Sequence, residues 1–170
     1  MNLELSSKEK NLLQDQLKHE AICIQKYTNY STQATDPELQ QLFSYLASQE
    51  QTHYSTIETM LMGQQPKLNQ QKPQGQSQSQ QNQGQQSQQS MQSTQMNYEQ
   101  GSMDNTIPSQ GDATLCTDSV MTEQFVSGSY DTSIFESTNQ TLTQALQHIQ
   151  KEEQEHGQKL QQYMQNKSLQ

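Results

Sequence analysis

The sequence predicts an all-α fold, a bundle of four helices built from two helical hairpins. Apolar residues recur at steps of three and four in two blocks of the chain, 1–63 and 112–170. A Gln/Ser-rich segment, 64–111, separates the blocks, and the second block repeats the pattern of the first. Because each helix carries one apolar stripe, we expect the two hairpins to pack together as one bundle.

The first block contains signals for two helices. Ser6 and Glu9 have the spacing of a capping box, which predicts a helix over about 7–34. Asp36, followed by proline, is a suitable N-cap for a second helix that ends near Gly63. The expected buried stripes are Leu13, Leu17, Glu20, Ile24 and Tyr27 in the first helix, and Leu39, Leu42, Leu46, Glu50, His53, Ile57 and Met60 in the second.

The second block predicts two more helices, from about Asp112 and from Asn139, with a break over 137–139. Asn139 is the expected N-cap of the last helix. The expected stripes are Cys116, Val120, Glu123, Ser127, Tyr130 and Ile134, then Leu142, Ala145, Ile149, Glu153, His156 and Leu160. A shift of 103 residues aligns the blocks and pairs Glu20 with Glu123, Tyr27 with Tyr130, Asp36 with Asn139, Leu39 with Leu142, Glu50 with Glu153, and His53 with His156.

The segment 64–111 differs from both blocks in composition. Glutamine occupies 18 of its 48 positions, and only 28% of the whole chain is hydrophobic. Such a segment buries too little apolar surface to offset its ordering entropy, so we predict disorder. If the two halves run parallel, this connection must return along helices about 40 Å long. One long crossover between the second and third helices is the ferritin-like topology.

Acidic residues interrupt every apolar stripe near its midpoint. A buried carboxylate must be paired, neutralised or bound to a metal ion. One Glu from each of two helices, with Glu-x-x-His from each of the other two, is the ligand pattern of dinuclear iron and manganese bundles. The sequence therefore predicts two Fe or Mn ions held by Glu20, Glu50, His53, Glu123, Glu153 and His156. The alternative is a buried hydrogen-bond network without metal.

Other polar residues have simpler interpretations. Tyr27 and Tyr130 are expected in the core first, and as hydrogen-bond partners of a ligand second. His19 and His148 fall beside the stripes and are expected to be exposed. The two cysteines, far apart in the chain, are expected to be buried free thiols.

Charge and hydropathy exclude several classes of protein. The net charge of −9, without a basic cluster, argues against a nucleic-acid partner. No apolar run approaches the length that spans a bilayer, and the N-terminus has no signal-peptide core, so we expect a soluble protein made in the cytoplasm.

Two runs in the second block carry a family resemblance: LCTDSVMTEQFVSGSYDTSIFES and LQHIQKEEQEHGQKLQQYM. From Thr114 to Met164 the chain resembles the coat F family of spore coat proteins, particularly its clostridial type, and from Leu12 to Leu61 it does so more weakly. The resemblance implies a ferritin-like bundle, synthesis in the mother cell, deposition in the spore coat, and other coat proteins as partners.

Two functions follow as expectations. The first is a structural coat protein, not an enzyme, whose Gln-rich insert self-associates or is cross-linked through Gln-to-Lys isopeptide bonds, with a passive linker as the alternative. The second is a dinuclear oxidoreductase, ferroxidase-like or disproportionating peroxide, that protects against oxidants. Iron storage in a closed shell is a weaker expectation, because the 48-residue insert is awkward to accommodate there.

Overall fold

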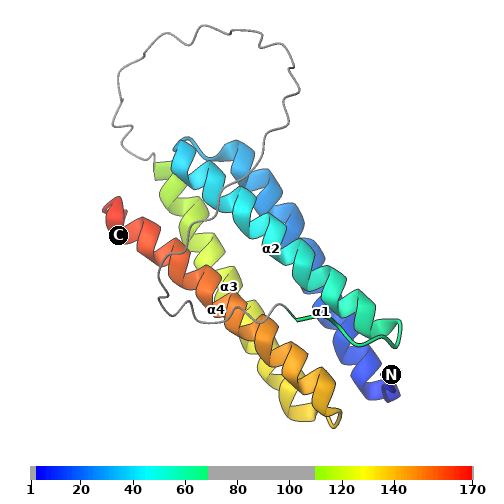
Figure 1. Cartoon of the computed structure of the whole chain (residues 1–170). Coiled ribbons are helices and arrows are strands. Elements are labelled where there is room, and N and C mark those ends of the chain that lie inside the picture. The colour runs from blue at the N-terminus through cyan, green and yellow to red at the C-terminus, as the bar shows by residue number, and fades with distance from the viewer. Residues whose placement is uncertain (1–2, 69–109, 170) are drawn as a thin grey trace, which may run out of the picture. The chain divides into compact units, whose positions relative to one another are not determined.

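The computed structural model describes residues 3–68 and 110–169 (Figure 1). This part of the chain forms four helices, α1 (Ser7–Gln33), α2 (Pro37–Leu61), α3 (Gln110–Glu136) and α4 (Gln140–Asn166). α1 pairs with α2 and α3 with α4, and one compact unit contains both hairpins. The predicted all-α bundle is confirmed. The segment predicted to be disordered lies, over 69–109, outside the described residues.

The helix ends follow the predicted local signals. Ser6 and Glu9 form the expected capping box, in which the Glu9 amide donates to Ser6 Oγ at 3.2 Å and Ser6 N donates to Glu9 Oε2 at 2.9 Å. Asp36 caps α2 through Glu38 N, and Asn139 caps α4 through Leu142 N. α3 begins slightly earlier than expected, at Gln110.

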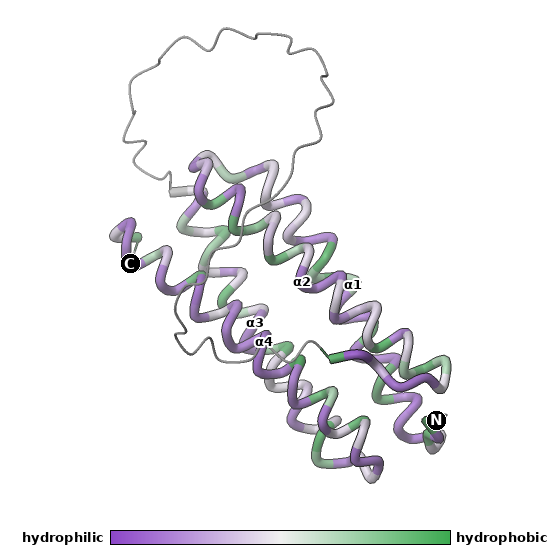
Figure 2. Tube along the Cα trace, in the orientation of Figure 1, coloured by the Kyte–Doolittle hydropathy of each residue, from purple (hydrophilic) through white to green (hydrophobic). Residues whose placement is uncertain are grey.

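Buried positions alternate at steps of four and three through all four helices, which is the heptad spacing of helices that pack nearly parallel or antiparallel. They are Glu9, Leu13, Gln16, Glu20, Cys23 and Tyr27 in α1; Leu39, Phe43, Leu46, Glu50, His53, Ile57 and Met60 in α2; Asp112, Cys116, Ser119, Glu123, Val126, Tyr130 and Ser133 in α3; and Leu142, Leu146, Ile149, Glu153, His156, Leu160 and Tyr163 in α4. Figure 2 shows these helices as largely hydrophilic, with hydrophobic residues at intervals.

Five of the expected stripe residues are only half-buried: Leu17, Ile24, Leu42, Val120 and Ile134. The prediction assigned the most apolar residue of each turn to the buried stripe. The spacings of three and four residues along the stripe were therefore placed in the wrong order. In α1 the buried positions belong instead to Gln16 and Cys23. Gln16 is tolerated there because its Nε2 donates to Ser133 Oγ at 2.9 Å and to Ser129 O at 3.1 Å.

The two hairpins are related by an approximate twofold rotation, so the parallel arrangement of halves considered from the sequence is wrong. The C-terminal part of α1 contacts the N-terminal part of α3, as in the hydrogen bond from Tyr30 to Asp118. The N-terminal part of α1 contacts the turn that follows α3, where Thr138 N donates to Glu9. α1 therefore runs antiparallel to α3 (Figure 1).

Each hairpin turn is capped by a carboxylate from the other hairpin. Asp112 accepts from the amides of Thr35 and Asp36 at 2.8 and 3.0 Å. Glu9 Oε1 accepts from the amides of Thr138 and Asn139 at 3.0 and 3.1 Å. These residues are again 103 positions apart, so the repeat extends to the contacts that join the hairpins.

The chain leaves α2 at one end of the bundle and begins α3 at the other (Figure 1). The connection between them therefore has to cover the length of the bundle, because α2 and α3 run in the same direction. A single long connection between the second and third helices is the topology that ferritin-like bundles use.

Candidate metal centre

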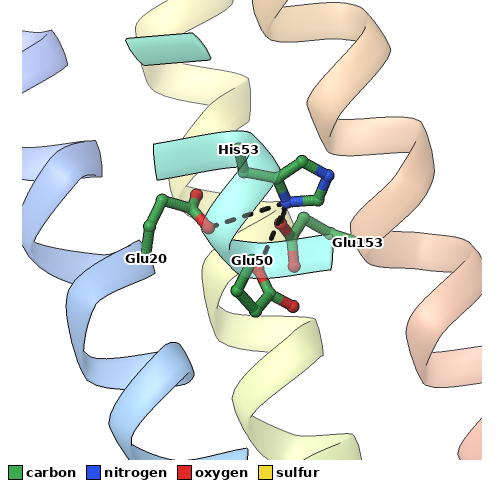
Figure 3. A group of neighbouring side chains, drawn as sticks. All are labelled: Glu20, Glu50, His53 and Glu153. Atoms are coloured by element: carbon green, nitrogen blue, oxygen red, sulfur yellow. Dashed lines mark hydrogen bonds and ion pairs between the residues drawn. The ribbon is translucent and has the colours of Figure 1, made fainter. Parts of the chain in front are cut away.

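The six predicted ligands meet at the middle of the bundle. The side chains of Glu20, Glu50, His53, Glu123, Glu153 and His156 are all at most 2% exposed. Each helix contributes its midpoint residues because the helices have nearly equal lengths and lie side by side. Figure 3 shows the carboxylates of three helices gathered around the imidazole of His53.

Two glutamates lie between the two histidines. Glu50 places Oε2 3.2 Å from His53 Nδ1 and Oε1 3.0 Å from His156 Nδ1. Glu153 places Oε1 2.7 Å from His53 Nδ1 and Oε2 3.8 Å from His156 Nδ1. The imidazole rings are stacked, with centroids 5.5 Å apart. Each of these carboxylates thus offers one oxygen to each half of the cluster, as a bridging ligand would.

The other two glutamates each serve one histidine. Glu20 Oε2 lies 3.7 Å from His53 Nδ1, and Glu123 Oε2 lies 4.0 Å from His156 Nδ1. Among the described residues, the ligand atoms of Glu20, Glu50, His53 and Glu153 lie within 4.8 Å of one another, and so do those of Glu50, Glu123, Glu153 and His156. The two groups of four share Glu50 and Glu153.

Protein hydrogen bonds do not satisfy this cluster. Glu20 Oε2, Glu123 Oε2 and both oxygens of Glu153 are buried without a hydrogen-bond partner. Glu153 Oε1 is close to His53 Nδ1, but the contact lacks hydrogen-bond geometry. A single imidazole nitrogen carries at most one hydrogen, so it cannot serve three carboxylates. A cation at each group would satisfy these oxygens, and the donor set fits a divalent ion with oxygen-rich ligation.

The pKa values of the buried carboxylates are displaced in opposite directions: burial and mutual repulsion raise some of them, and contacts with the histidines lower another. Burial, together with the charges of Glu153 and Glu50, raises the pKa of Glu20 to about 8. Burial and the charge of Glu153 also raise the pKa of Glu123 well above its ordinary value. Burial acts on Glu153 in the same sense, but contacts with His156 and His53 outweigh it and hold its pKa far below the ordinary value. Protons therefore neutralise part of the cluster, and metal binding would displace them.

The histidines respond to the same carboxylates. Burial lowers the pKa of His156, but Glu153 and Glu50 overcome that effect and raise it to about 8. The pKa of His53 is also raised well above its ordinary value, because Glu152, Glu153, Glu20 and Glu50 outweigh the effect of burial.

Two buried tyrosines hold the outer glutamates across the bundle. Tyr27 of α1 donates to Glu123 Oε1 in α3, and Tyr130 of α3 donates to Glu20 Oε1 in α1. Both interpretations of these tyrosines are therefore correct, since each is fully buried and each contacts a candidate ligand. The tyrosines leave one oxygen of each glutamate, Oε2, facing the cluster.

One residue of the site was not foreseen. Glu152 Oε2 lies 3.0 Å from His53 Nε2, the ring nitrogen that points away from the cluster, and orients the imidazole. The sequence offered one signal for this role, because Glu152 directly precedes Glu153. Only Glu153 lies on the buried stripe, so Glu152 was not selected as a site residue. The repeat places Gln49 at the equivalent position in α2.

The remaining residues singled out from the sequence lie near this centre or beside it. Cys23 is a buried free thiol, and burial with the charges of four nearby glutamates raises its pKa well above the ordinary value. Cys116 is also free and buried, as expected. The expected exposure of His19 and His148 is wrong. His19 is half-buried with its ring edge against Phe125, and His148 is half-buried 3.6 Å from Glu152.

A comparison with protein families matches residues 111–169 to the Coat F domain. The match covers the second hairpin. The resemblance predicted for this part of the sequence is confirmed, and the weaker one over Leu12–Leu61 stays a prediction. No curated protein and no solved structure matched the chain.

A match to the Coat F domain suggests a spore coat protein, which agrees with the location and the coat-protein partners expected from the sequence. Within the described residues, no helix combines the length and apolarity needed to span a bilayer. The self-association or cross-linking predicted for 64–111 stays a prediction, because most of that segment is outside the described residues.

Proposed function

We propose that this protein is a spore coat component whose four-helix bundle holds a dinuclear iron or manganese centre. The observation that carries the proposal is the pair of four-residue groups sharing Glu50 and Glu153. Two such groups from one internal repeat match the number and type of ligands that dinuclear carboxylate bundles use. The matched Coat F domain supports the coat setting.

Each part of the chain has a defined task in this proposal. Glu50 and Glu153 would be shared by the two ions, and His53 and His156 would each supply one imidazole. Glu20 and Glu123 each supply one outer carboxylate, which Tyr130 and Tyr27 orient. Glu152 fixes the ring of His53. The residues that would bind the two ions directly are Glu20, Glu50, His53, Glu123, Glu153 and His156.

The bound ions would supply Lewis-acid and redox chemistry toward oxygen or peroxide. Bulk water has little access to the ligands, because every ligand side chain is at most 2% exposed. An oxidant-protecting activity, ferroxidase-like or peroxide-disproportionating, is therefore compatible with a structural place in the coat. The protein would then act both as a packing unit and as a protective one.

The competing function is that of a coat scaffold alone, in which the six residues form a buried proton-sharing network. The pKa values favour this state whenever metal is lacking, since raised values at Glu20 and Glu123 remove charge from the core. The two functions differ in whether a stoichiometric metal is present.

The test is elemental analysis of the full chain expressed with added iron and manganese. We expect about two ions per chain in the wild type and none in Glu50→Ala, because Glu50 belongs to both groups. Glu155→Ala is the matched control, since this residue lies on α4 with a side chain 43% exposed and outside both groups. It should keep both ions.

Circular dichroism of each variant shows whether the bundle is intact, and Glu50→Gln replaces Glu50→Ala if the smaller side chain prevents folding. A wild-type protein without stoichiometric metal would refute the dinuclear centre and leave the scaffold. If the metal is present, ferroxidase and peroxide assays on wild type and Glu50→Gln decide whether it also reacts.

A further inference from the structure

A groove of about 450 Å³ lies on the surface between α3 and α4, and two candidate metal ligands are among its lining residues. They are Glu123, an outer candidate ligand, and Glu153, which both groups of four share. Ser127, Gly128 and Gly157 line it as well, and Asp131 adds a further carboxylate. No described lysine, arginine or histidine is among its lining residues, so the groove favours cations.

Two of the residues that line the groove carry carboxylate oxygens that nothing in the protein satisfies. Glu123 Oε2 and both oxygens of Glu153 are buried without a hydrogen-bond partner. Their side chains are 1% and 0% exposed. Unpartnered carboxylate oxygens on residues that line an acidic groove are a destination for a positive ion.

Small residues keep this groove open. A Cβ atom added at Gly157 would lie 3.5 Å from Glu123 Cβ, so a large side chain at this position would cover Glu123. A Cβ atom at Gly128 would meet no atom within 4 Å. Glycine is unfavourable inside a helix, and both residues lie well within α3 and α4.

The first hairpin has large residues at the equivalent positions. The shift of 103 residues pairs Gly157 with Tyr54 and Ser127 with Ile24. Tyr54 and Ile24 are both partly buried. The two halves of the repeat thus have the same residue types at all six ligand positions, but the first hairpin has larger side chains at the positions where small residues line the groove of the second hairpin.

We infer that divalent cations reach the dinuclear centre through the groove between α3 and α4, and that Gly157 keeps this route open. The inference rests on the proposed function and names the side from which the site is loaded. The route passes Asp131 and Ser127, crosses the surface left free by Gly157, and ends at Glu123 and Glu153.

The test measures the rate at which metal-free full-length protein takes up Mn²⁺. Free aqueous Mn²⁺ gives an electron paramagnetic resonance signal that is lost on binding, so mixing experiments follow loading directly. We expect Gly157→Tyr to load roughly tenfold more slowly or worse, because ions must then wait for local opening of the helices. The number of ions bound at equilibrium should stay at the wild-type value.

Three further variants sharpen the test. Ser127→Ile should also slow loading, since it narrows the same groove. Tyr54→Gly combined with Gly157→Tyr should restore fast loading, because it opens the equivalent side of the first hairpin. Lys151→Tyr places the same bulk on the exposed face of α4, where the side chain of Lys151 is 74% exposed, and should load at the wild-type rate.

Loading of Gly157→Tyr and Ser127→Ile at the wild-type rate, with the wild-type number of ions, would overturn the route and leave the metal centre intact. Loss of ions at equilibrium in Gly157→Tyr would also overturn it, because Gly157 would then be needed for the site itself. A wild-type protein that binds no Mn²⁺, Fe²⁺ or other divalent ion would instead remove the proposed function on which the inference rests.

Discussion

The two hairpins share an internal framework but differ on their outer surfaces. Inside, ligand for ligand, Glu20 corresponds to Glu123 and His53 to His156. Outside, the first hairpin has Tyr54 where the second has Gly157. The six candidate ligands thus keep their residue type across the repeat, while positions 54 and 157 differ.

The contacts between the hairpins are also repeated. Glu9 and Asp112 occupy equivalent positions, and each accepts from two amides of the opposite turn. Removal of either carboxylate would leave two backbone amides of the opposite turn without their acceptor, and the amide of Asp36 is one that is buried.

The largest expected effect comes from removing one outer ligand in each half. Glu20→Gln and Glu123→Gln should each lower the bound metal from about two ions per chain to about one, because each glutamate belongs to only one of the two groups. Elemental analysis with a metal titration by calorimetry measures this. If one variant loses both ions and the other only one, the halves are not equivalent as metal sites.

A smaller effect is expected from the reciprocal caps. Glu9→Gln and Asp112→Asn should each lower the free energy of unfolding by roughly 1–3 kcal/mol, since each leaves backbone amides with a weaker acceptor. Chemical denaturation followed by circular dichroism measures the change. Glu4→Gln, at an exposed residue before α1, is a control that should change stability little. Similar losses in the control would count against the caps.

The cap at Glu9 also predicts a pH dependence. Burial tends to raise the pKa of Glu9, but hydrogen bonds from Ser6, Thr138 and Asn139 outweigh it and lower the pKa from 4.5 to about 2. Because the folded-state pKa lies below that of the unfolded chain, the cap stabilises the fold fully above pH 4.5 and is lost as the pH falls toward 2. The stability difference between wild type and Glu9→Gln should therefore shrink across that window. A constant difference would contradict the assignment.

The smallest expected effect lies in the outer part of the second hairpin. Gly128→Ala should raise the free energy of unfolding by roughly 0.5–1 kcal/mol, because alanine favours the helix and its Cβ atom would meet no neighbour. Thermal unfolding of the metal-free protein measures the change. A destabilised variant would mean that position 128 is packed in a way its open surroundings do not indicate.

The sequence predicted the features that depend on neighbouring residues or that occur in both halves of the repeat. The caps at Ser6, Asp36 and Asn139 depend on neighbouring residues, so their spacing was sufficient. The six candidate ligands were predicted because two blocks repeat the same interruption of an apolar stripe. Their convergence then followed from helices of equal length.

The features that the sequence did not predict depend on partners far along the chain. Gln16 is buried because Ser129 and Ser133 accept its amide hydrogens, and no local signal distinguishes it from Leu17. The direction of α3 relative to α1, which allows Tyr27 to reach Glu123, is likewise a property of the folded bundle. The role of Glu152 required knowing which nitrogen of His53 faces outward.

The exchange of capping carboxylates between the hairpins makes folding cooperative. A hairpin alone would have a turn whose amides lack their acceptor and a midline of unpaired acids, so each half depends on the other for its own stability. The two halves must also meet across a connection of 48 residues, from 62 to 109, whose closure entropy grows only slowly with length. The bundle is therefore expected to melt as one unit, and lengthening the connection would cost it little.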